Sequence, residues 1–217
     1  MSLKIPNHPV SFSSHFEPLA PSTTESARAN QYGFVKTSSY FSGGGPAENK
    51  HEKFKVNLVT NTSLNNVLEP ENIYSMDESV TRVCLTGDDQ PDFTNKTNVN
   101  GLGMVIKRQE VAPEPNENGV RLEVIVAHSD WDSEARVLRK FNVKYIVPGS
   151  KNLIKTHSLY IVGREVSIIG RLVDFDMEES MAVVQASYVS ITNGHQLGKL
   201  YPAGQASPSG NSSPNQN

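Results

Sequence analysis

The chain has 217 residues, of which 36% are hydrophobic and 20% are charged, and its formal net charge is −3. This charge excludes a chain that is basic along its whole length, so any surface that attracts phosphate must be local. The single cysteine, Cys84, excludes an intramolecular disulfide and a thiolate metal cluster. No apolar run approaches the roughly 20 residues of a membrane-spanning helix, and the first residues lack the apolar core of a secretion signal. We therefore expect a protein without membrane contact, in the nucleus or the cytoplasm.

Residues 1–50 predict a disordered N-terminal tail. They are rich in Ser, Thr and Pro, show no sustained strand or helix period, and end in a Gly-rich stretch, 42–46, that is typical of a linker. Scattered aromatic residues leave a second interpretation open, in which this segment docks on a partner or on the domain itself. These aromatic residues are Phe12, Phe16, Tyr32, Phe34, Tyr40 and Phe41.

Residues 51–97 predict strands that extend the main domain. Phe54, Val56 and Leu58 recur at every second position, and a further apolar run covers residues 80–85. Alternation of this kind is typical of a strand with one buried face. The pattern leaves open whether these strands lengthen the sheet of the main domain or cap it.

Five strand patterns between residues 98 and 200 predict the main domain. They cover residues 101–107, 121–127, 141–147, 166–173 and 181–191. A short helix suits residues 150–160, between the third and fourth strands. Residues 201–217 contain no large aliphatic side chain, so they predict a disordered C-terminal tail.

The last two strands carry the most specific motif. Gly163-Arg-Glu-Val-Ser-Ile-Ile-Gly-Arg-Leu172 is followed, after a hairpin, by Val184-Gln-Ala-Ser-Tyr-Val-Ser-Ile191. This pair resembles the ending of OB-fold domains that bind single-stranded nucleic acid, as in the bacterial SSB and replication protein A families. The resemblance covers about residues 98–194. It implies an all-β fold, a small five-stranded OB-like barrel with extra N-terminal strands and disordered tails, in which glycines allow sharply bent strands.

Two features depart from that family. The hairpin between the last two strands, residues 174–180, carries four carboxylates, which would repel phosphate. The C-terminal end also lacks the acidic, aromatic-ended tip with which bacterial SSB proteins dock partners.

The candidate site lies around the second and third strands of the expected barrel. From Trp131 to Lys155 there are six basic and two acidic residues, beside the only tryptophan of the chain. Aromatic rings among cations are the pattern that stacks bases and meets phosphates. An ordinary solvated edge, with Trp131 half-buried over the core, is the alternative. The residues predicted for the nucleic-acid-binding site are Lys107, Arg108, Trp131, Arg136, Arg139, Lys140, Lys144 and Tyr145.

Motifs for catalysis are absent from the sequence, which has no Gly-x-Ser-x-Gly, no phosphate-binding loop and no His-Glu-x-x-His. Residues 128–132, His-Ser-Asp-Trp-Asp, are interpreted as a structural turn and not as a metal site. We expect no enzyme activity, no cofactor and no metal. Two functions stay open: binding of single-stranded nucleic acid, or an OB-like module for protein–protein interaction or assembly. The twelve basic and twelve acidic residues of 98–200 favour the second.

Overall fold

The computed structural model describes residues 7–26, 31–77, 79–112 and 119–196. Within these residues it consists of strands and one short 3-10 helix, and no helix among them is long and apolar enough to cross a membrane. The protein is therefore all-β, as the sequence predicts. The expected C-terminal tail, 201–217, lies outside the described residues.

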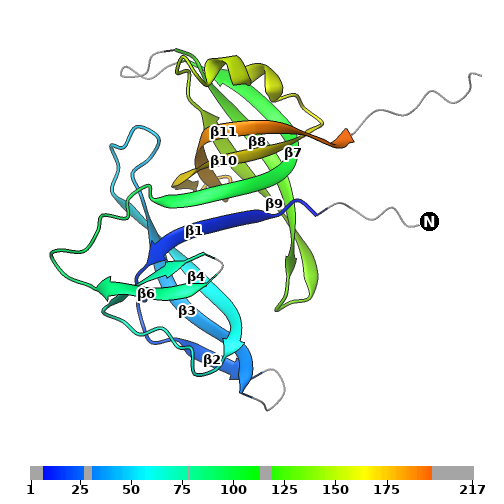
Figure 1. Ribbon diagram of the computed structural model, residues 1–217. Helices are drawn as coiled ribbons and strands as arrows, with labels where there is room; N and C mark the ends of the chain where they lie inside the picture. Colours follow the sequence, from blue (N-terminus) through cyan, green and yellow to red (C-terminus); the bar gives the residue numbers. More distant parts are fainter. Residues whose placement is uncertain (1–6, 27–30, 78, 113–118, 197–217) are drawn as a thin grey trace, which may run out of the picture.

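Five strands in the second half of the chain form a closed barrel (Figure 1). They are β7 (Thr97–Val111), β8 (Arg121–Asp132), β9 (Val137–Val147), β10 (Arg164–Asp176) and β11 (Met181–Gln196). The strands pair in the order β7-β8-β9-β11-β10, and β10 pairs again with β7, which closes the ring. β9 and β11 are parallel, and the 3-10 helix η1 (Ile154–Leu159) follows β9. The barrel is compatible with the predicted OB-like fold.

Alternation along β8 explains why this part of the chain closes into a barrel. Every second residue from Leu122 to His128 is buried, and Val124 and Val126 have no exposed surface. Burying one such aliphatic side chain contributes about 1.5–3 kcal/mol. A slip of one residue would turn the whole set outward, so the apolar pattern fixes the register of the sheet.

Strand β10 needs a glycine where it bends. Its pairing with β11 shifts register between Ile169 and Gly170. A Cβ atom on Gly170 would lie 2.4 Å from the carbonyl oxygen of Gln185, so no side chain fits there. Gly170 therefore has the role that the sequence predicts for it, the close approach of two backbones at a bend.

The first half of the chain also forms strands, and this corrects the prediction of a disordered tail over residues 1–50. The strands are β1 (Val10–Phe16), β2 (Thr23–Ser26), β3 (Tyr32–Gly43), β4 (Glu52–Ser63), β5 (Asn72–Met76) and β6 (Val80–Leu85). β2, β3 and β4 form a separate sheet. β1 pairs with β7 at its start and with β5 at its end, so it joins the β5–β6 hairpin to the barrel.

Strand β3 is hard to predict from the sequence because small polar residues occupy part of its buried face. Its buried face holds Thr37 and Ser39 as well as Phe41, so apolar residues do not alternate along it. The Ser39 hydroxyl donates to the carbonyl oxygen of Glu17 at 2.7 Å, and the Thr37 and Ser22 hydroxyls share a 2.7 Å hydrogen bond. These bonds satisfy the hydroxyl groups away from water, and a strand forms without a visible apolar period.

Candidate functional site

The β8–β9 hairpin extends beyond the closed part of the barrel (Figure 1). β8 pairs with β9 from residue 137 to residue 147, whereas β11 pairs with β9 only over residues 143–146. All of residues 137–142 are exposed. Within the described residues, the first half of β9 is therefore an edge strand with one side unpaired.

The outer face of this hairpin combines an aromatic ring with a cation. Cross-strand pairing places Trp131 beside Leu138 and Ser129 beside Lys140, and residues that pair directly share a face of the sheet. The side chain of Trp131 is 58% exposed. An indole this open presents a ring face on which a planar ligand can stack.

Three of the predicted basic residues carry exposed charges, and two of the three, Arg136 and Lys140, lie on the hairpin that carries Trp131. Lys107 pairs with Ile125 on β7 and β8, Arg136 lies in the β8–β9 turn, and Lys140 lies on β9. All three are exposed, and none forms an ion pair with another residue that the structure describes. They are available to an anionic ligand.

Lys144 also lies on the outer face, but its ammonium group already forms ion pairs with carboxylates. Its Nζ lies 2.6 Å from Asp176 and 3.1 Å from Glu179. Burial disfavours the charged form, but the two carboxylates outweigh burial and raise the pKa of Lys144. Lys50 makes a further 2.6 Å pair with Asp174. The acidic hairpin expected to repel phosphate is thus partly neutralised by the protein's own lysines.

Three predicted site residues lie away from the outer face, and here the prediction is corrected. Tyr145 is fully buried, with its hydroxyl 3.2 Å from His128 Nε2, so its ring is closed to a base. Arg139 pairs with Asp132 at 3.0 Å on the opposite face of the hairpin. Arg108 donates to the backbone carbonyl that follows η1, at 3.4 Å. Side chains alternate along a strand, so the neighbours of an outward lysine point inward.

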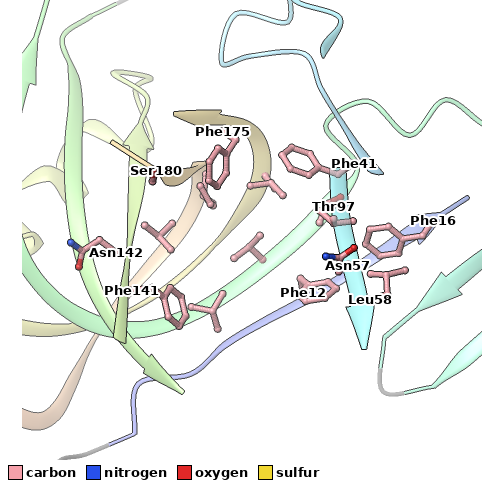
Figure 2. Close-up of a pocket in the computed structure, with 17 residues that line it drawn as sticks. Phe12, Phe16, Phe41, Asn57, Leu58, Thr97, Phe141, Asn142, Phe175 and Ser180 are labelled. Carbon is pink, nitrogen blue, oxygen red and sulfur yellow. The ribbon is translucent and has the colours of Figure 1, made fainter. Parts of the chain in front are cut away.

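An apolar cleft of about 410 Å³ lies between the N-terminal sheet and the barrel (Figure 2). β4 contributes one wall and β9 the other, and β1, β3, β7, β10 and β11 complete the lining. Phe12 and Phe141 point into it from opposite sides and are 50% and 39% exposed. Its aromatic lining consists of Phe12, Phe16, Phe41, Phe141 and Phe175.

The sequence prediction missed this cleft because both halves of the chain build it. Phe12, Phe16 and Phe41 belong to the segment that was expected to be disordered. Their place beside barrel strands means that these aromatic residues dock on the domain itself. The scattered aromatics were the one signal in the sequence, but they do not show which strands they meet.

Acidic and histidine side chains do not gather into a metal site in the described part of the chain. No group of three His, Cys, Asp or Glu residues there is placed to hold a metal ion. His8 and Glu165 form a buried pair with Nε2 and Oε2 2.8 Å apart, and Glu165 also bonds Thr192. This pair connects His8, two residues before β1, to β10 and β11.

Comparison of the sequence with protein families and with curated proteins finds no match to either. Among solved structures, the chain is similar to a deletion mutant of the single-stranded DNA binding protein from Thermus aquaticus. The TM-score is 0.44 and the identity 12%, over 91% of this chain and 99% of that chain. Nothing about function follows from a likeness at this level.

Proposed function

We propose that the protein binds single-stranded nucleic acid on the outer face of the β8–β9 hairpin, as a binding protein and not as an enzyme. The observation that carries this proposal is the exposed Trp131 ring beside Lys140, on a hairpin that extends from a closed β-barrel. The indole stacks on a base, and the cations of Lys107, Arg136 and Lys140 meet phosphates.

A single strand suits this surface better than a duplex does. Bases in a duplex are already stacked on each other, whereas the bases of a single strand are free to stack on aromatic side chains. The exposed cations are few and local, as expected for a chain of net charge −3. Arg136 and Lys140 lie on one hairpin and Lys107 lies on the neighbouring strand β7, so they do not form the broad basic surface that a duplex backbone attracts.

Titration with a labelled single-stranded oligonucleotide at two salt concentrations tests the proposal. Each phosphate contact adds about 0.7 to the slope of log affinity against log salt for a single strand. We expect the double variant Arg136→Ala, Lys140→Ala to bind more weakly and to lower this slope by about 1.4. Trp131→Ala should cost about 1–3 kcal/mol of binding free energy and leave the slope nearly unchanged, because it removes stacking and no charge.

Lys151→Ala is the matched control, because Lys151 is an exposed lysine near η1, at the opposite end of β9 from the hairpin turn. It should bind as the wild type does. Absence of salt-sensitive binding by the wild type at micromolar concentration would contradict the proposal. Trp131 and Leu138 would then be assigned to a protein–protein interface, in which exposed aromatic residues act as anchors.

A further inference from the structure

The two walls of the apolar cleft carry the same short sequence pattern. It reads Lys55-Val56-Asn57-Leu58 on β4 and Lys140-Phe141-Asn142-Val143 on β9. In both segments a lysine, an apolar residue, an asparagine and a second apolar residue follow one another. Both strands belong to hairpins, and the asparagine and both apolar residues of each segment line the cleft.

Alternation gives each wall the same two surfaces. Lys55 and Asn57 are exposed on β4, as are Lys140 and Asn142 on β9. The apolar residues between and after them face the interior of the cleft. Each wall therefore presents one cation and one amide outside an apolar interior. Neither lysine forms an ion pair with any residue that the structure describes.

The interior of the cleft suits a flat, uncharged group. Phe141 stacks on His128 with ring centroids 5.7 Å apart, and Phe12 meets Phe16 edge-on at 6.1 Å, so both rings are supported from one side. Both keep exposed ring surface. No charged side chain belongs to the described lining, so the interior accommodates a group without charge.

Two ion pairs connect the N-terminal half of the chain to the barrel. Lys36 on β3 pairs with Glu134 in the β8–β9 turn at 2.5 Å. Lys50, just before β4, pairs with Asp174 on β10 at 2.6 Å. The first half of the chain thus contacts the barrel at two separate places. A preorganised site loses less conformational entropy on binding.

We infer that bases of the single strand enter this cleft, and that Lys55 and Lys140 hold phosphates on its two sides. The inference rests on the proposed function and extends its site from the barrel to β4. A cation on each wall matches a chain with a phosphate beside every base, whereas an apolar peptide has no charge to match. The volume of about 410 Å³ lies in the range of about 300–1,000 Å³ typical of ligand pockets.

Variants of Lys55 on β4 and of Phe12 on β1 test the inference, because neither residue is part of the proposed hairpin site. With the same labelled oligonucleotide, Lys55→Ala should lower the salt slope by about 0.7. Phe12→Leu keeps an apolar side chain but removes the ring, and should weaken binding about 5- to 150-fold. Lys151→Ala is again the control, and urea unfolding of each variant verifies that it is folded.

The outcomes separate the two claims. If Trp131→Ala weakens binding while Lys55→Ala and Phe12→Leu bind as wild type, the cleft inference is overturned and the proposed function stands. If Lys55→Ala and Phe12→Leu weaken binding and Trp131→Ala does not, the cleft is the site and the hairpin proposal fails. If the wild type does not bind, both are wrong.

Photocrosslinking gives a second readout that does not depend on affinity. An oligonucleotide that carries 5-iodouracil is crosslinked to the wild-type protein, and the modified peptide is identified by mass spectrometry. We expect crosslinks at Phe12 or Phe141, whose rings point into the cleft (Figure 2). Crosslinks confined to Trp131 would overturn the inference.

Discussion

His128 has one defined tautomer inside the barrel. The carbonyl oxygen of Leu102 lies 2.8 Å from Nδ1 and can only accept, so Nδ1 carries the proton. Nε2 then accepts from the Tyr145 hydroxyl at 3.2 Å. Burial lowers the pKa of His128 to about 4. The ring is thus neutral at pH 7 and connects β7, β8 and β9 through its two nitrogens.

This buried histidine predicts a loss of stability in acid. The pKa of His128 is lower in the folded protein than the ordinary value of about 6.5, so the unfolded chain takes up the proton first. Its contribution is fully present above about pH 6.5 and is lost as the pH falls towards 4, by up to about 3 kcal/mol. Urea unfolding of the wild type and of His128→Gln between about pH 7 and pH 4 measures this. An equal loss in both proteins would show that other groups cause it.

At the scale of the element, substitutions in β10 test which face of this strand is directed to the core. Ile168 has no exposed surface, whereas its neighbour Ile169 is 43% exposed. Ile168→Asp places a carboxylate among apolar side chains and should cost more than about 4 kcal/mol of the free energy of unfolding. Ile169→Asp should stay within about 0.5 kcal/mol of wild type, because its charge meets water.

Urea denaturation followed by circular dichroism compares the two variants, which differ only in the face of β10 that carries the charge. Similar losses of stability in both would contradict the assigned faces. A folded Ile168→Asp protein together with an unfolded Ile169→Asp protein would show that the assignment of faces is reversed.

The alternation of buried and exposed residues also determines which strands can be predicted from the sequence. β8 and β10 are predictable because large aliphatic residues occupy their buried positions, from Leu122 to Val126 and from Val166 to Ile168. β3 is not, because buried hydroxyl groups replace aliphatic ones on its inner face. Sequence alone does not show that such hydroxyl groups find partners, because those partners come from other segments.

The candidate site is predictable in part for a related reason. Clustering in the sequence identifies the hairpin that carries Trp131 and Lys140. It also gathers Arg139 and Tyr145, which the period of two places on the opposite face. The cleft cannot be predicted from the sequence, because the contacts of Phe12 with the barrel depend on the path of β1.

At the scale of the whole molecule, the first half of the chain follows the connectivity of the barrel. β2, β3 and β4 form a meander like β7, β8 and β9, and the β5–β6 hairpin corresponds to β10–β11. β1 pairs antiparallel with β5, as β7 does with β10, so β1 and β2 together correspond to the single strand β7. In the described residues the pair that corresponds to β9–β11 is missing, and a groove of about 570 Å³ lies between β4 and β6. The cleft thus lies between the third strands of two related units.

Backbone contacts between these units predict that they resist proteolysis together. β1 pairs with β7, the amide of Gly45 donates to the carbonyl oxygen of Val173 at 2.9 Å, and that of Asn95 donates to the carbonyl oxygen of Ser42 at 3.1 Å. Cleavage requires local unfolding, and unfolding either unit would break these bonds. Limited proteolysis followed by mass spectrometry should therefore yield a stable fragment that begins before β1 and includes β11. Accumulation of a fragment that begins near β7 would show instead that the barrel is stable without the N-terminal strands, and that the walls of the cleft separate easily.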